Sequence, residues 1–397
     1  MTDFNWTKSQ FHLPEGMIYL DGNSLGPLPL NANERVAASM RNEWGEMLIT
    51  GWNKAGWMDM PRRVGDRIAP LLGAPSGSIV MGDTLSIKVY QALSSALEMR
   101  PDRRIILSDT GNFPSDLYMA EGLIKSLGRD YELRVIPPEE IENAITDEIA
   151  VTLITEVDYR TGRRHDMSAL TKRAHACGAL TVWDLAHSAG AIDVNLTAAN
   201  VDFAVGCTYK YLNGGPGAPA FIYVRPDLAE NVEPALSGWL GHVAPFDFEL
   251  NYRAGEGIDR LRVGTPPILG LVALDAALDV WDHVDMRDVR ARSVELSEAF
   301  VNEVSAGCPA LTLASPTNPE ERGSQISYHF ADGYAAMQAM IDRKIIGDFR
   351  APDLMRFGFT PLFIGLEDVR QAARTLCDVI NLKLWDDPAY KTRQKVT

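Results

Sequence analysis

Cysteine is scarce in this sequence, and the few thiols are far apart. The four cysteines are Cys177, Cys207, Cys308 and Cys377, with no CxxC pair and no Cys/His cluster at the spacing of metal ligands. This pattern argues against disulfides and against a structural zinc site. We therefore expect free thiols in the core and no bound metal.

Positive charge and long apolar runs are also in short supply. The chain has 38 Lys and Arg against 53 Asp and Glu, a net charge of −15, and this sign repels nucleic-acid phosphates and anionic lipid heads. Apolar runs such as residues 268–274 are far shorter than the ~20 residues of a membrane span. The first residues form no secretory signal. We expect a cytoplasmic protein that binds neither nucleic acid nor membrane.

The alternation of short apolar runs with helical periodicity predicts an α/β fold. A chain of 397 residues exceeds the roughly 250–300 at which one hydrophobic core stops growing, so two domains are expected. The strands predicted for the first domain lie at residues 78–81, 104–108, 150–155, 180–184, 203–207 and 220–224. Because they do not alternate strictly and helices separate them, we predict a mainly parallel sheet covered on both faces.

After about residue 267 the pattern changes to long helices with a few strands. The helices are predicted at 268–281, 287–304 and 366–384, and the strands at 324–330 and 355–359. We predict a large α/β domain over 46–267 and a smaller α+β domain formed by 1–45 and 268–397. A helix near 32–44 would pack on the smaller domain.

Polar and aromatic residues follow several predicted strands, where ligands of open α/β sheets bind. After the strand 78–81, a turn at Gly82 to Ser86 leads into a helix whose free N–H groups could hold a phosphate, although many helices begin with such caps. Phe113 follows the strand 104–108, where it could stack on a planar ligand or belong to the core. Each feature alone is weak.

The next two strands end in ionisable groups. Asp184 ends one strand, and His187 follows it; the acid could pair with a protonated ring nitrogen, or it could be a helix cap beside a core histidine. Lys210 follows the strand 203–207 and precedes a glycine-rich turn, where desolvation would favour a nucleophilic amine. A phosphate cup, a stacking ring, an acid and a lysine on consecutive strand ends are the parts that pyridoxal 5′-phosphate (PLP) requires.

Seven ordered segments of this sequence resemble the motifs of the kynureninase family. They span nearly the whole chain and are Tyr19 to Gly26, Asn112 to Asp116, Asp158 to Gly162, Asp184 to His187, Thr208 to Asn213, Ser237 to His242 and Arg262 to Pro267. The resemblance implies the aspartate-aminotransferase-like fold type I of PLP enzymes, with a large parallel-sheet domain and a smaller α+β domain. It also implies a homodimer with the active site at the subunit interface.

The resemblance assigns roles to individual residues. Lys210 would hold PLP covalently, Asp184 would pair with its ring nitrogen and Phe113 would stack on the ring. The further cofactor-binding positions are Leu85, Ser86, Asp116, Thr155, His187 and Tyr209, with Trp239 and Thr265 reaching the phosphate from the other subunit. The substrate-binding positions are Arg356, which matches the arginine for the α-carboxylate, together with Ser24 and Trp52.

The implied reaction is the hydrolysis of L-kynurenine to anthranilate and L-alanine in tryptophan catabolism, with 3-hydroxykynurenine as a second candidate substrate. We expect Lys210 to act as general base on the substrate Cα and Tyr209 to help activate water and stabilise the oxyanion. Two positions depart from the animal pattern: Thr265 replaces an asparagine and Trp52 replaces a histidine against the substrate ring. They leave the choice between the two substrates open.

Two other functions are compatible with such a fold. One is a cysteine desulfurase or a related class V aminotransferase. A cysteine desulfurase needs a mobile cysteine, for which Cys308 is the candidate, but no motif around Cys308 supports this role. A PLP-binding protein without catalytic activity would be expected to lack Lys210 or Asp184, and both are present.

Overall fold

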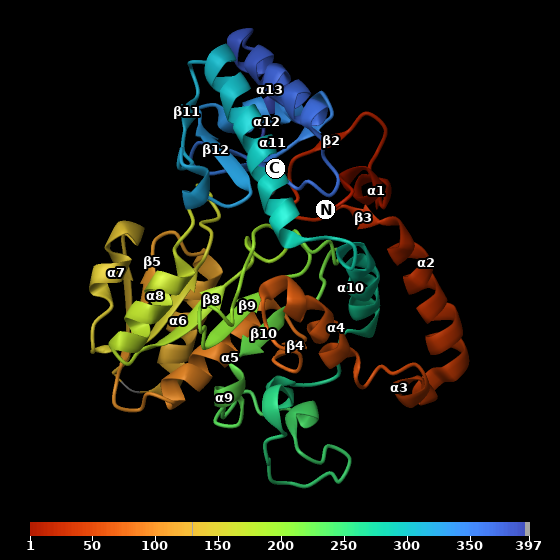
Figure 1. Cartoon of the computed structure of the whole chain (residues 1–397), viewed down its shortest axis with the longest axis vertical. Coiled ribbons are helices and arrows are strands. Elements are labelled where there is room, and N and C mark those ends of the chain that lie inside the picture. Colours follow the sequence, from red (N-terminus) through yellow and green to blue (C-terminus); the bar gives the residue numbers. More distant parts are fainter. Residues whose placement is uncertain (129, 394–397) are drawn as a thin grey trace.

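The computed structural model describes residues 1–128 and 130–393, which form two larger sheets with their helices and two short two-stranded sheets (Figure 1). The large sheet has seven strands in the order β4-β10-β9-β8-β7-β5-β6. Their bounds are β4 Ile79–Met81, β5 Ile105–Asp109, β6 Glu132–Ile136, β7 Ile149–Thr155, β8 Leu180–Asp184, β9 Phe203–Gly206 and β10 Phe221–Val224. Only β10 runs antiparallel to its neighbours, which confirms the mainly parallel sheet.

Helices cover both faces of the large sheet because its strands are apolar on both sides. Val151 and Leu153 of β7 belong to the core under α5 (Leu85–Glu98) and α6 (Pro114–Leu127), while Ile154 belongs to the core under α4, α8 and α10. The bounds of these three helices are Met60–Ile68, Met167–Ala176 and Ile268–Trp281. This packing is what a continuous apolar strand requires.

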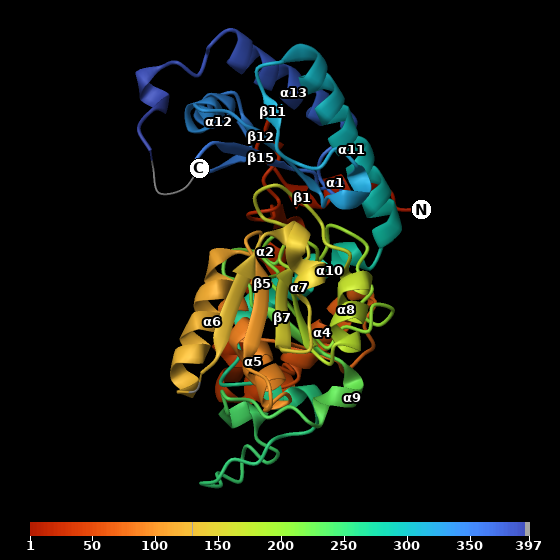
Figure 2. The ribbon, with the colours of Figure 1, turned by 90° about the vertical axis from the view of Figure 1, so that its left-hand side faces the viewer.

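The second sheet lies at the other end of the molecule, above the large sheet in Figure 2. It has four strands in the order β11-β12-β15-β14, with bounds Thr312–Leu313, Gln325–His329, Leu354–Gly358 and Asp348–Arg350. The helices beside it are α11 Met286–Gly307, α12 Gly333–Asp342 and α13 Leu366–Asn381. Most of the predicted helices and strands of this part are confirmed to within a few residues.

The N-terminal segment connects with both parts of the molecule. β2 (Ile18–Tyr19) pairs in parallel with β13 (Ile345–Ile346), and β1 (Phe11–His12) pairs with β3 (Leu28–Pro29). α2 (Leu30–Ala38) packs on α10, which also contacts α4. The helix expected at 32–44 consists of two helical types: α2 ends at Ala38, and residues Ser39–Gly45 continue as a π-helix. The domain border at 267 stays a prediction.

The remaining helices are short. They are α1 Phe4–Ser9, α3 Gly51–Lys54, α7 Ile141–Ala144 and α9 Pro226–Ala229. Within the described residues, no helix has both the length and the apolar character needed to cross a membrane.

Candidate active site

The carboxyl ends of β5, β7, β8 and β9 lie along one edge of the large sheet, facing the second sheet (Figure 2). Thr155 at the end of β7 is in register with Asp184 at the end of β8, and Asp184 is in register with Val205 of β9. Lys210 follows β9 by a short turn. Parallel register thus brings residues far apart in the sequence to one place.

The ammonium group of Lys210 lies 3.2 Å from Nε2 of His187. His187 is buried, and burial together with the nearby charges of Lys210, Arg356 and Arg350 holds the pKa of its imidazole well below the usual value. A neutral imidazole can accept a hydrogen bond from the lysine. The site therefore contains Lys210 and a neutral His187 in direct contact.

Two buried carboxylates, Asp184 and Asp116, lie near Lys210. Asp184 accepts hydrogen bonds from Thr155 Oγ1 at 3.3 Å and from the Ala186 N–H at 2.9 Å. Both oxygens of Asp116 are buried without a hydrogen-bond partner. Burial raises the pKa of both carboxyl groups, the charge of Asp184 raises that of Asp116 further, and Lys210 opposes both shifts. Among the described residues, Lys210 is the cation that acts on both carboxyl groups, so the pair would accommodate a second positive group.

Phe113, the residue before α6, leaves 42% of its surface exposed, so part of its ring is available to a ligand. Leu85 and Ser86 form the first turn of α5, and Thr84, the N-cap, makes no side-chain bond to that turn. The first N–H groups of a helix have no partner within the helix, and they favour an anion. A partly exposed ring and an anion-binding turn thus follow β5 and β4, two strands that are consecutive in the sequence but separated by four strands in the sheet.

Tyr209 is half-buried beside Lys210, with the ammonium 5.8 Å from the centre of the tyrosine ring. Burial, and next the nearby Cys207 thiol, raise the pKa of its phenol. The hydroxyl therefore stays protonated at neutral pH and can donate a hydrogen bond. The main-chain oxygen of Tyr209 accepts from the Gly26 N–H at 2.8 Å, which ties this turn to the N-terminal segment.

Arg356 on β15 is 1% exposed, and an internal carboxylate pairs with it. Its Nε donates to Asp348 Oδ1 at 2.7 Å, its Nη2 donates to Asp348 Oδ2 and to Ser24 Oγ at 2.9 Å, and its Nη1 donates to the Tyr159 carbonyl. Arg350 also contacts Asp348, at 2.7 Å. The structure thus brings Ser24 and Arg356 together, within a cluster of two arginines and one aspartate.

The other three predicted positions lie elsewhere in the chain. Trp52 of α3 and Trp239 line one cavity of about 250 Å³, together with Ile49, Asn53, Met58, Leu240 and Phe246. Thr265 is exposed. Figure 1 places α3 and the segment after α9 at the end of the molecule opposite the second sheet.

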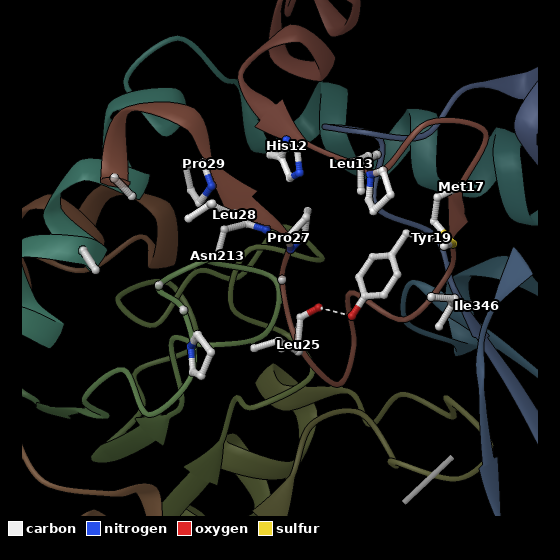
Figure 3. A pocket seen from close by; sticks show the side chains of 17 residues that line it. His12, Leu13, Met17, Tyr19, Leu25, Pro27, Leu28, Pro29, Asn213 and Ile346 are labelled. Carbon is white, nitrogen blue, oxygen red and sulfur yellow. Dashed lines mark hydrogen bonds between the residues drawn. The ribbon is translucent and has the colours of Figure 1, made fainter. Parts of the chain in front are cut away.

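A larger cavity, of about 370 Å³, lies beside the turn that follows Lys210 (Figure 3). Its walls come from the N-terminal segment and the Asn213 to Pro216 turn, and the Tyr19 hydroxyl donates to the Leu25 carbonyl at 2.8 Å. The residues that line it do not include Lys210, Asp184 or His187. The chemistry described above lies outside this cavity.

Several residues of the site were not predicted from the sequence. Asp348, Arg350 and Tyr159 meet Arg356 only because β14 and β15 pair in register and because the loop after β7 reaches the second sheet. The available signals are an aspartate placed after the apolar pair Ile345–Ile346 and, for Tyr159, its place in the Asp158 to Gly162 motif, which assigned it no role.

The described residues include no cluster of three or more His, Cys, Asp or Glu suited to a metal ion. All four cysteines are free; Cys207, Cys308 and Cys377 are buried and Cys177 is partly exposed. Cys308 is 1% exposed at the end of α11, which does not fit the mobile thiol of a desulfurase.

Comparison with known proteins gives one family. The model of the kynureninase C-terminal domain matches residues 289–376. Kynureninase of Pseudomonas fluorescens is 47% identical over 98% of this chain and 95% of its own length, and that of Burkholderia pseudomallei (strain 1106a) is 48% identical over the same shares. The chain belongs to the kynureninase family.

Solved structures with a similar fold are more distant in sequence. Apo cysteine desulfurase from Thermococcus onnurineus NA1 has a TM-score of 0.80 and 18% identity, covering 95% of this chain and 98% of its own. A C-DES mutant with glycine covalently linked to its PLP cofactor has a TM-score of 0.82 and 16% identity, covering 94% of this chain and 99% of its own. At such identities the likeness concerns the fold, that of fold type I PLP enzymes.

Proposed function

We propose that this chain is a PLP-dependent hydrolase that cleaves L-kynurenine to anthranilate and L-alanine. The observation that carries this proposal is the 47–48% identity to kynureninases over 98% of the chain. The presence of Lys210, His187 and Asp184 at one edge of the large sheet supports it.

The residues of the site fit PLP. The unpartnered oxygens of Asp116 and the buried Asp184 lack a second cation, and a protonated ring nitrogen is such a group. Phe113 would lie on the ring, the first turn of α5 at Leu85 and Ser86 would hold the phosphate, and Lys210 would hold the cofactor covalently. Thr155 would fix the Asp184 carboxylate through its 3.3 Å hydrogen bond.

Each step of the reaction uses a residue of this chain. Bound PLP supplies an electron-accepting ring that stabilises negative charge on the carbons next to the substrate's amino group. Arg356 would bind the α-carboxylate, and the amine of Lys210 would take the Cα proton. Asp184 would keep the proton on the ring nitrogen, and Tyr209 would donate its hydrogen to the oxygen that gains charge when water adds to the γ-carbonyl.

We propose further that the active enzyme is a homodimer in which Trp239 and Thr265 serve the partner's site. Both belong to the segment between α9 and α10, and Trp239 lies in a region with many exposed apolar side chains. These side chains are Trp44, Leu48, Ile49, Trp239, Val243, Phe246, Phe248 and Leu250. Exposed apolar patches of this kind are typical of protein interfaces. The free cysteines support a reducing compartment, the cytoplasm.

The proposal is tested by mixing the PLP-loaded protein with L-kynurenine and following anthranilate fluorescence, with Lys210→Ala as the matched variant. We expect a signal from the wild type that is lost in the variant, because no other amine replaces Lys210. A folded, PLP-loaded wild type that releases no anthranilate would contradict the proposal, and cysteine and 3-hydroxykynurenine would then be the next substrates.

A further inference from the structure

Tyr159 lies between Phe113, the proposed stacking residue, and the arginine cluster of Arg356 and Arg350. Its ring meets that of Phe113 edge to face, with the ring centres 5.0 Å apart and the planes at 80°. Its main-chain oxygen accepts hydrogen bonds from Arg356 Nη1 and from Gln325 Nε2, the latter at 3.0 Å. One residue therefore contacts both Phe113 and Arg356.

The loop that carries Tyr159 is held firmly in place. The Asp158 carboxylate, 4% exposed, accepts the Arg160 N–H at 2.7 Å and thereby closes a tight turn. Arg160 Nη2 donates to the Thr110 carbonyl at 3.1 Å, and Ser327 Oγ donates to the Arg160 carbonyl. The loop is thus attached both to the segment before Phe113 and to β12, so the backbone that carries the Tyr159 ring has a fixed position.

Phe113, in contrast, leaves much of its ring uncovered. With 42% of its surface exposed, its ring is only partly covered by other residues, and among the described residues Tyr159 is the aromatic residue in contact with it. A side chain that must adopt one orientation on binding lowers affinity by the entropy that it loses. A residue that fixes the orientation beforehand removes part of that cost.

We propose that Tyr159 is a positioning residue whose ring holds Phe113 in the orientation that stacks on the bound cofactor. The proposal rests on the proposed function only in taking PLP as the ligand of Phe113. Tyr159 itself need not touch the cofactor; it acts through Phe113. The ring carries this role, because the backbone contact with Arg356 is independent of the side chain.

The experiment compares two variants of the full chain, Tyr159→Leu and Tyr159→Phe, by the dissociation constant of PLP measured from its absorption and fluorescence. Edge-to-face aromatic pairs contribute enough to change an equilibrium constant by roughly three- to tenfold. We expect Tyr159→Leu to weaken PLP binding by that factor, with an altered absorption band. Tyr159→Phe keeps the ring and should bind PLP within about twofold of the wild type.

A matched control separates positioning from general loss of packing. Phe330 and Trp385 form a similar edge-to-face pair near the second sheet, with centres 5.5 Å apart and planes at 80°. Phe330→Leu should lower the melting temperature without changing the PLP dissociation constant. Circular dichroism shows whether each variant is folded.

Wild-type PLP affinity in folded Tyr159→Leu would overturn the proposal, and so would an equal loss of affinity in Phe330→Leu. A loss of affinity in Tyr159→Phe that matches the loss in Tyr159→Leu would also overturn it, since the hydroxyl would then be responsible. Failure of the wild type to cleave kynurenine would contradict the proposed function but would leave this result on PLP binding intact.

Discussion

Tyr209, the residue next to Lys210, is the proposed hydrogen-bond donor to the reacting carbonyl oxygen. Because the pKa of the Tyr209 phenol is raised by burial, the group remains a proton donor throughout the neutral range. We expect Tyr209→Phe to lower kcat for L-kynurenine by about 10²-fold or more, the usual effect of removing one oxyanion donor. Stopped-flow anthranilate fluorescence at saturating PLP measures this, and full turnover by the variant would refute the assignment.

Asp21, beside the arginine cluster, should make stability depend on pH. Burial, and next the charge of Asp348, raise the pKa of its carboxyl group from 3.8 to about 7 in the folded protein. The folded state thus favours the protonated form, so the free energy of unfolding from this group falls as pH rises through 7. Between pH 5 and pH 8, the contribution of Asp21 to the free energy of unfolding falls by about 2 to 3 kcal/mol.

Asp21→Asn removes this titration, and the variant should lose less stability than the wild type over the same pH interval. Urea unfolding of both proteins at pH 5 and pH 8 gives the comparison. An identical pH dependence in the two proteins would mean that Asp21 does not titrate in this range. Other buried acids such as Asp116 and Glu156 also contribute to the pH dependence of the free energy of unfolding, but they are present in both proteins, so their contributions cancel in the comparison.

At the scale of single residues, the positions of polar residues relative to the predicted strands indicated only part of the site. Lys210, Asp184 and His187 could be predicted because each follows a strand that is itself recognisable in the sequence. Asp348 could not, because its contact with Arg356 depends on the register of two antiparallel strands. The local sequence around Asp348 does not indicate that its carboxylate binds Arg356 through both oxygens, because strand pairing brings the two residues together.

The close contact between the N-terminal segment and the Lys210 turn requires glycine at residue 26. A Cβ at this position would lie 2.4 Å from the Lys210 carbonyl oxygen and 2.4 Å from Asn213 Nδ2. We expect Gly26→Ala to displace the turn and to lower the free energy of unfolding by about 1–3 kcal/mol, with a loss of activity in the folded fraction.

Gly122 in α6 is the matched control, because no atom beyond its chain neighbours and the adjacent helix backbone lies within 4 Å of the Cβ that alanine would add there. Gly122→Ala should raise stability by about 0.5–1 kcal/mol, since alanine favours a helix over glycine. Thermal unfolding and kynurenine turnover of both variants test the pair. Wild-type stability and activity in Gly26→Ala would show that the turn tolerates the shift.

Among the elements, the strands buried on both faces were the easiest to predict. All six predicted strands of the large sheet are present, while β6 was missed because Glu132 and Arg134 interrupt its apolar pattern. β6 is an edge strand with much of its surface exposed, so burial does not demand an apolar sequence. The π-helix after α2 was missed because local periodicity does not distinguish it from an α-helix.

For the whole molecule, the sequence predicted two domains, with the cofactor residues at the strand ends of the large sheet. Contacts between distant parts of the chain complete the site in ways that the sequence did not indicate. The second sheet contributes Arg356, and the N-terminal segment contributes Ser24, more than 300 residues away in the sequence. Their meeting depends on how the two sheets face each other. Trp52, Trp239 and Thr265 lie apart from this place in a single chain, which is compatible with the proposed site shared between two subunits.

A shared site predicts recovery of activity when two inactive variants are mixed. Lys210→Ala destroys a chain's own site, whereas Trp239→Ala would damage the site of its partner. In a mixed dimer, one site then carries both defects and the other carries neither. Random mixing makes half of the dimers mixed, with one of two sites intact, so about a quarter of wild-type activity is expected.

Co-refolding the two variants in equal amounts and measuring anthranilate release tests this. Mixing Lys210→Ala with Asp184→Ala is the control: both changes affect the chain's own site, so no mixed dimer has an intact site. Recovery in the first mixture alone requires that Trp239 act across the interface. If the first mixture stays inactive although mixed dimers form, Trp239 serves its own chain, and the arrangement of the site must be intramolecular.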